Sequence, residues 1–269
     1  MEIIENFIFG KKGSSVDCED GLVITDSIIA VVDGATSKTQ KKFDNLASGA
    51  FARKTLCNIL RQPDIEKLNS EELFSKLTSG LKENSEKFHK DLSFEEYPRA
   101  CIIIYNNLYK EIWSYGDCQC IINGELHTHE TAIDALNSQL RAFYLECALL
   151  EGHNIEELSK CDIGRMGIYD NLKKQSMFEN KDVPFGFSVL NGEPINPNMI
   201  VRYKVKENDE IVLSSDGYPF LKDTLQESEE QLENVLKNDP MCFSIYKATK
   251  GIVDGNYSFD DRCYCKFIV

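Results

Sequence analysis

A run of apolar residues near the start of the chain ends abruptly at an acid. Residues 28–32 are all apolar, which is typical of a strand that is buried on both faces. Asp33 follows where that strand should emerge, and Gly34 opens a polar turn. Because Asp-Gly is a common turn pair, this site alone leaves two alternatives open, a plain turn and a functional carboxylate.

The same pattern recurs along the chain. Acidic residues stand at the edges of five strand-like segments, and random turns would not require that. Carboxylates at neighbouring strand ends supply the hard oxygen ligands that Mg²⁺ and Mn²⁺ prefer. The acids in this pattern are Glu19, Asp20, Asp33, Asp117, Asp216, Asp260 and Asp261.

The composition narrows the possible partners. The chain has 269 residues, with 44 acidic against 30 basic side chains and a net charge of −14, which argues against nucleic acid as its main ligand. The sequence has no apolar stretch long enough for a membrane span and does not begin like a signal peptide. We therefore expect a cytoplasmic protein with neither a nucleic acid nor a membrane as its partner. Its oligomeric state is left open.

The ten cysteines are expected to be reduced and mostly buried, because the sequence carries no secretion signal. Cys118 and Cys120 have the spacing of one strand face, as do Cys263 and Cys265. Histidines at positions 127 and 129 could also share a face, which leaves a His–Cys metal site as an alternative.

The order of predicted elements indicates an α+β protein rather than a strictly alternating one. The second predicted helix has Ser70 as a candidate N-cap. We expect one domain over residues 1–269, with a variable flap or insert at about 153–198. Strands are predicted at 2–10, 21–25, 27–33, 100–105, 109–117, 118–123, 198–205, 209–216 and 262–269, and helices at 43–61, 69–92, 130–152, 227–237 and 240–253.

A cluster of carboxylates of this kind could hold two divalent cations about 3.5–4 Å apart, which share a carboxylate and a water. The shared water loses a proton easily, and the metals screen the charge of a phosphate. Ser214 and Ser215 precede Asp216 but are not framed by G-x-S-x-G, so a nucleophilic serine is not expected.

Five stretches of the sequence resemble the metal-dependent serine/threonine protein phosphatases, the phosphatase 2C family, as a divergent member. In order they are CEDGLVI, IAVVDGATS, YGDCQCIING, NDEIVLSSDGYPFL and DDRCYCKFIV. They run from residue 18 to the C-terminus. The resemblance implies two packed antiparallel β-sheets flanked by helices, with a binuclear Mn²⁺ or Mg²⁺ centre at one end.

The resemblance also implies roles for individual residues. Asp33 would bridge both cations, Gly34 would offer its carbonyl, and Asp33 and Asp216 would act through the activated water. Asp117, together with Asp216, matches the place of a third, weaker metal. Apart from the resemblance, Asp117 could be only a turn acid, and Asp261 is expected to cap or pair rather than ligate. The implied metal ligands are Glu19, Asp20, Asp33, Gly34, Asp117, Asp216 and Asp260.

The chain departs from the family where the substrate phosphate is gripped. The usual arginine is replaced by Ser15, and a lysine such as Lys12 would substitute without the two-pronged guanidinium. Other basic candidates are Lys11, Arg53, Arg99 and Arg165.

The implied function is hydrolysis of phosphoserine and phosphothreonine in a phosphorylated protein substrate. The alternatives are a catalytically weak or inactive phosphatase-like binding module, and a small-molecule phosphatase.

Overall fold

The structure is a computed structural model that describes residues 1–14, 18–35 and 41–269. Its strands form two five-stranded antiparallel sheets. The first sheet has the order β1 (Glu2–Phe9), β10 (Arg262–Ile268), β9 (Glu210–Ser214), β6 (Gln119–Ile122) and β7 (Glu125–His127). The second has the order β2 (Asp20–Ile24), β3 (Ile28–Ala35), β4 (Arg99–Asn106), β5 (Glu111–Tyr115) and β8 (Val201–Lys204).

The two sheets pack face to face, as predicted. Val31 and Ile103 of one sheet share a fully buried cluster with Leu213 and Phe267 of the other. Cys120, Cys263 and Cys265 of the strands, and Cys118 just before β6, lie in this same cluster with free thiols. Their alternate spacing therefore marks the inner faces of strands and packing, not a disulfide.

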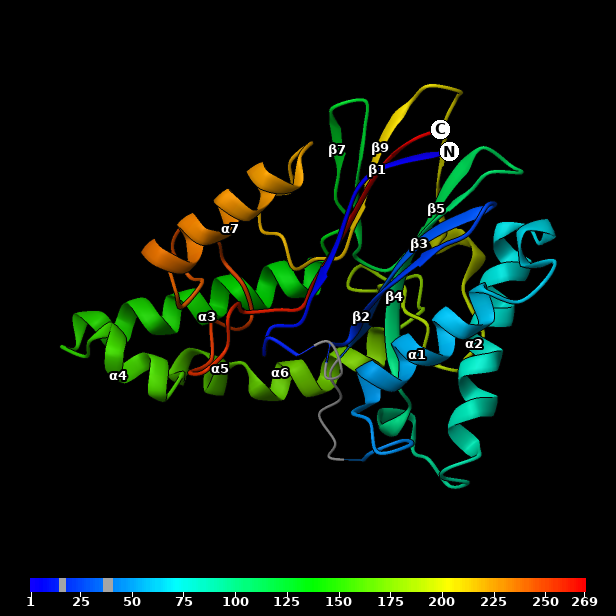
Figure 1. The fold of residues 1–269 in the computed structure, drawn as a ribbon. Coiled ribbons are helices and arrows are strands. Elements are labelled where there is room, and N and C mark those ends of the chain that lie inside the picture. The colour runs from blue at the N-terminus through cyan, green and yellow to red at the C-terminus, as the bar shows by residue number, and fades with distance from the viewer. Residues whose placement is uncertain (15–17, 36–40) are drawn as a thin grey trace.

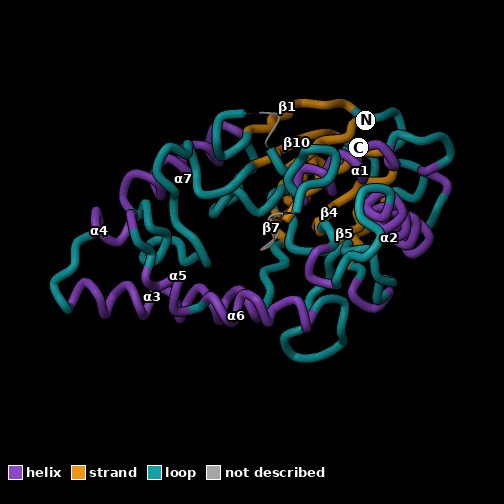
Figure 2. The backbone as a smooth tube through the Cα atoms, turned by 90° about the horizontal axis from the view of Figure 1, so that it is seen from below, coloured by secondary structure: helices purple, strands orange, loops and turns teal. Residues whose placement is uncertain are grey.

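Helices flank the sandwich on both sides (Figures 1 and 2). A second core forms where α1 and α2 cover the outer face of the β2–β3–β4 sheet, with Leu56, Phe74 and Ile102 buried in it. The remaining helices lie on the other side of the strands. The helices are α1 (Ser48–Leu60), α2 (Ser70–Glu86), α3 (Ala132–Leu150), α4 (Ile155–Lys160), α5 (Ile163–Gly167), α6 (Tyr169–Lys174) and α7 (Leu225–Asn238).

The N-cap prediction for α2 was wrong by one residue. Asn69, not Ser70, caps the helix, and its side chain accepts hydrogen bonds from the amides of Glu71 and Glu72. The backbone amide of Asn69 in turn donates to the Glu72 carboxylate, which completes a capping box. Ser70 is instead the first helical residue and is buried.

The predicted helix over 240–253 was also wrong, because this stretch is a loop. The Asp239 carboxylate accepts hydrogen bonds from the amides of residues 243–246, which an extended helix would have paired with carbonyls. Cys242 adopts a positive φ of 48°, which also interrupts helical geometry. A side-chain acceptor has replaced the helical partner of each of these amides.

Arg141 of α3 holds the same loop from the other side. Its fully buried guanidinium donates to the carbonyls of Met241, Cys242 and Ala248 and to the carboxylate of Asp162. Arg141 lies on a helix face that the apolar periodicity alone would assign to the core. Its side chain instead provides hydrogen-bond donors for the backbone carbonyls of an irregular segment.

Residues 153–198 contain α4, α5, α6 and irregular chain. Arg99 of β4 ties this segment to the sandwich through an ion pair with Glu179, in which Nε and Oε1 are 2.6 Å apart. That this stretch acts as a flap, within a single domain 1–269, stays a prediction. Across the described residues, no helix combines the length and apolar character needed to cross a bilayer.

Replacing Arg141 by Met should lower the free energy of unfolding by about 3–5 kcal/mol, because it leaves Asp162 and three carbonyls without their buried donor. Urea denaturation would measure the change. Arg61→Met is the matched control, since the exposed Arg61 also donates to two carbonyls and should cost about 1 kcal/mol or less. Equal effects of the two substitutions would contradict the role assigned to Arg141.

Candidate metal centre

Two of the predicted ligands face each other on adjacent strands. Asp20 at the start of β2 lies directly opposite Asp33 of β3 in the antiparallel register. The amide of Gly34 donates to the carbonyl of Glu19 at 3.0 Å, which holds the two strand ends together. The pairing brings both carboxylates to one end of the sandwich.

Gly34 is needed for a close contact at this end. A Cβ at position 34 would lie 2.3 Å from the carbonyl oxygen of Gly49 and 2.6 Å from that of Glu19. A Cβ on Gly49, at the start of α1, would lie 2.4 Å from Oε1 of Glu19. The helix start and the strand end thus meet backbone to backbone, and the side chain of Glu19 lies against them.

The other sheet brings its acids to the same end. Asp216 follows β9, and Asp260 and Asp261 precede β10. A Cβ on Gly217 would lie 2.0 Å from the Asp261 carbonyl oxygen, so only glycine allows these two turns to touch. The first sheet therefore places its carboxylates beside those of the second.

Asp261 joins the two sheets instead of pointing at a ligand site. Its carboxylate accepts hydrogen bonds from the amides of Lys11 at 2.7 Å and Glu19 at 3.0 Å. The prediction that Asp261 pairs is confirmed, and this pairing fixes the start of β10 to the start of β2.

Asp117 lies in the connection that crosses from β5 in one sheet to β6 in the other. Cys101 is the register partner of Asp33 on β4, and a Cβ on Gly116, next to Asp117, would lie 2.4 Å from the Sγ of Cys101. Asp117 therefore lies beside the Asp33 strand end.

The carboxylates at this end change one another's pKa values. Burial raises the pKa of Asp33, and the charges of Asp20, Asp117 and Asp260 raise it further, while a hydrogen bond with Asp216 lowers it. Burial likewise raises the pKa of Asp216, with the charge of Asp33 as the next cause. The pKa values of Asp20 and Asp117 are also raised, mainly by burial. Acids from distant parts of the chain therefore share one electrostatic site.

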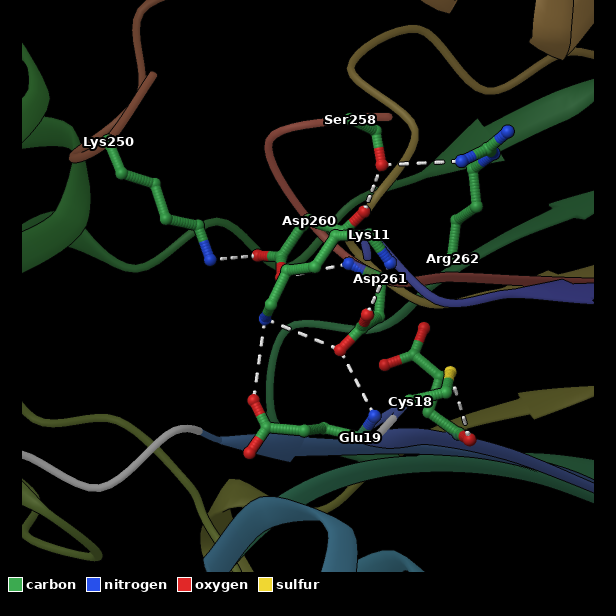
Figure 3. A network of polar contacts seen from close by, with 9 residues as sticks. Lys11, Cys18, Glu19, Lys250, Ser258, Asp260, Asp261 and Arg262 are labelled. Carbon is green, nitrogen blue, oxygen red and sulfur yellow. Dashed lines mark hydrogen bonds and ion pairs between the residues drawn. The ribbon is translucent and has the colours of Figure 1, made fainter. Parts of the chain in front are cut away.

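Asp260 behaves differently because two lysines hold it. Burial alone would raise its pKa, but the charges of Lys250 and Lys11 lower it to about 2. Lys11 Nζ lies 3.1 Å from Asp260 Oδ1, 3.4 Å from Glu19 Oε2 and 3.3 Å from Asp261 Oδ2, and Lys250 pairs with Asp260 Oδ2 (Figure 3). Asp260 is therefore an ionised carboxylate with two ammonium partners.

Lys11, one of the basic candidates, places its ammonium group among the acids. Lys12 is exposed on the following turn, and its part in substrate binding stays a prediction. Arg99 is bound to Glu179 and to carbonyls, and Arg165 donates to the Thr249 carbonyl. Ser15, which replaces the expected arginine, lies outside the described residues.

Sequence reasoning did not find Lys250. This lysine belongs to the 240–253 stretch that was predicted as a helix, where it carried no sign of facing acids. Its only sequence signal is the nearby Gly251, which favours a turn over a helix.

The donor chemistry at this end fits a hard divalent cation. Oδ2 of the buried Asp20 has no hydrogen-bond partner among the described residues, which is costly unless a ligand satisfies it. Within residues 1–14, 18–35 and 41–269, however, no three His, Cys, Asp or Glu side chains are already grouped so as to hold a metal ion. The oxygen donors are gathered, but their side chains do not form a finished coordination shell.

Two cavities of about 330 Å³ each open beside this site and share Asp117 and Asp134 in their walls. One is lined by Asp216, Asp260 and Lys250. The other lies under the 153–198 segment and is lined in part by Arg99 and Glu179.

No family model matches the sequence, and no curated protein is significantly similar to it. Solved structures do share its fold. The serine/threonine phosphatase PstP/Ppp of Mycobacterium tuberculosis is 14% identical, with a TM-score of 0.51, and the alignment covers 99% of this chain and 98% of that one. The catalytic domain of PstP in complex with two manganese ions is 13% identical, with a TM-score of 0.52 and 100% of both chains covered.

A third neighbour is the serine/threonine phosphatase of S. agalactiae. It is 12% identical, with a TM-score of 0.50, and 98% of each chain is covered. The predicted fold is therefore confirmed: the chain folds, over almost its whole length, like serine/threonine phosphatases of the phosphatase 2C type.

If the acids form a metal site, Mn²⁺ should stabilise the protein, by about 2.7 kcal/mol at a concentration of 100 times Kd. In EDTA, Asp33→Asn should melt higher than the wild type, because it removes one of the mutually repelling carboxylates. With Mn²⁺ the order should reverse. Thermal melting with and without Mn²⁺ tests both statements.

Asp26→Asn is the control for this experiment, because Asp26 is exposed on the turn between β2 and β3. It should respond to Mn²⁺ as the wild type does. An equal Mn²⁺ response from Asp33→Asn and the wild type would show that Asp33 is not a ligand.

Proposed function

We propose that the chain is a Mn²⁺- or Mg²⁺-dependent phosphomonoester hydrolase that acts on phosphoserine or phosphothreonine in phosphorylated proteins. The observation that carries the proposal is the meeting of carboxylates from both sheets. Asp20 faces Asp33 across β2 and β3, and Asp216, which follows β9, is close enough for the charge of Asp33 to raise its pKa. Carboxylates that are buried against one another are strongly destabilised unless cations or protons offset their charge. The shared fold also supports this class of activity.

Two cations would be held mainly by carboxylates, Asp33 among them. When bound, such cations lower the pKa of a coordinated water and screen the charge of a phosphoryl group. Asp117, together with Asp216, would supply a third and weaker position. The residues that would hold the cations are Glu19, Asp20, Asp33, the carbonyl of Gly34, Asp117, Asp216 and Asp260.

Side chains of the chain would orient the attacking water and bind the substrate. Asp33 and Asp216 would orient the attacking water by accepting its hydrogens, because they come from opposite sheets and converge. The cavity lined by Asp216 and Asp260 has room for a phosphoryl group and the side chain that carries it. The exposed Lys12 would contact the substrate.

One observation favours a second candidate, a phosphatase-like binding module with little or no turnover. Lys11 and Lys250 already neutralise Asp260, one of the proposed ligands. A chain whose ligand is occupied in this way could keep the fold and the cavity while losing the chemistry.

Hydrolysis of a phosphothreonine peptide in the presence of Mn²⁺ tests the proposal directly. Asp216→Asn should lower kcat/KM by about 100-fold or more, the order of loss seen when one group that stabilises transition-state charge is removed. Release of inorganic phosphate would be measured with Mn²⁺, with Mg²⁺ and with EDTA.

Asp254→Asn serves as the matched control, since Asp254 is exposed and lies outside the site. It should leave kcat/KM unchanged. Absence of turnover by the wild type with either metal would contradict the hydrolase and favour the binding module.

A further inference from the structure

Asp260 is held by two ammonium groups that come from opposite ends of the chain. Lys250 pairs with Oδ2, and Lys11 pairs with Oδ1 at 3.1 Å (Figure 3). Lys11 also reaches Glu19 and Asp261, so it sits within the acids and not at their edge. Both oxygens of this carboxylate are therefore in contact with a positive charge supplied by the chain itself.

The backbone around Lys250 is fixed in place. The carbonyl of Ala248 accepts from Arg141 at 2.9 Å, and that of Thr249 accepts from Arg165 at 2.6 Å. On the other side, the amide of Ile252 donates to the Pro240 carbonyl at 2.9 Å. Bonds on both sides of Lys250 therefore hold the loop that presents it to Asp260.

The backbone of Lys11 is fixed as well. Its amide donates to the Asp261 carboxylate at 2.7 Å, and its carbonyl accepts from the amide of Tyr257 at 2.7 Å. The ion pairs with Asp260 thus form between two anchored segments, and their position is set by the fold.

An ammonium group and a divalent cation seek the same carboxylate oxygens and repel each other at close range. A cation that binds Asp260 must either displace a lysine or tolerate its charge nearby. Asp20, Asp33 and Asp216 form no ion pair with a lysine among the described residues, although the charge of Lys250 also acts on Asp216 and lowers its pKa. A metal ion that binds Asp260 therefore has to compete with a lysine, whereas one that binds Asp20, Asp33 and Asp216 does not have to break an ion pair.

We propose that Lys250, assisted by Lys11, is a built-in cation that competes with a divalent metal ion for Asp260. The Asp20–Asp33–Asp216 side then binds its ion first. The Asp260 side takes an ion only when Lys250 is displaced. This inference rests on the metal centre of the proposed function and adds an internal competitor to it.

Mn²⁺ binding to the full-length protein tests the inference without an activity assay. Free Mn²⁺ would be followed by its electron paramagnetic resonance signal during titration of wild type and Lys250→Met. The variant should bind its weakest ion about tenfold more tightly, or bind one ion more per chain. Lys11→Met should change binding in the same direction.

Lys247→Met is the matched control. Lys247 lies on the same loop, but its Nζ contacts Gln139 instead of an acid. Its replacement removes the same charge without freeing a carboxylate. It should therefore shift Mn²⁺ affinity much less than Lys250→Met does.

A double-mutant cycle separates direct competition from a general charge effect. Asp260→Asn should weaken Mn²⁺ binding little in the wild type, because the lysines already occupy that carboxylate. The same substitution in the Lys250→Met background should remove the gain. Melting curves in EDTA check that each variant is folded, and Lys250→Gln replaces Lys250→Met if that variant fails to fold.

The outcomes distinguish this inference from the proposed function. Unchanged Mn²⁺ binding in the lysine variants, with binding lost in Asp33→Asn, overturns the competition and leaves the metal centre standing. Binding that appears only in the lysine variants supports the competition and contradicts a metal-dependent hydrolase in the native chain. Absence of binding in every variant overturns both.

Discussion

Mutual repulsion among carboxylates at one end of the sandwich is the constraint that the rest of this structure has to satisfy. Asp20, Asp33 and Asp216 meet where solvent cannot fully screen them, and their pKa values rise accordingly. Such an arrangement is stable only with compensating charge or protons. Lysines provide that charge at Asp260, and the Asp20 oxygen that has no partner within the described part of the chain indicates where the compensation is incomplete.

The scaffold brings the acids together through a few specific contacts. Asp261 bridges the starts of β2 and β10 through two backbone amides, so the sheets are held together at the end where their acids meet. Glycines at 34, 49 and 217 allow backbones to touch where any Cβ would collide. The site therefore depends on contacts between segments that are more than two hundred residues apart in the sequence.

Much of the fold could be predicted from sequence because strands and helices have distinct apolar periods. The buried strand that carries Asp33 and the four cysteines of the inner core follow directly from that rule, although the strand continues to Ala35 instead of ending at Asp33 as predicted. The 240–253 loop could not be predicted this way, since the amides are bound by a distant side-chain carboxylate, Asp239. The pairing of Lys250 with Asp260 could not be predicted from sequence either, because Arg141 fixes the loop that carries Lys250. The convergence of the acids was predicted from the order of the acidic motifs along the chain and from the family resemblance. Their pairing with lysines could be seen only in the three-dimensional structure.

Anomalous diffraction from crystals grown with Mn²⁺ tests the central claim most directly. The account predicts an anomalous peak within bonding distance of the carboxylates of Asp20, Asp33 and Asp216, at full occupancy. A peak near Asp260 should be weaker and should be accompanied by displacement of Lys250. Crystals saturated with Mn²⁺ that show no peak among these carboxylates, with their side chains still pairing only with each other and with lysines, would contradict the account.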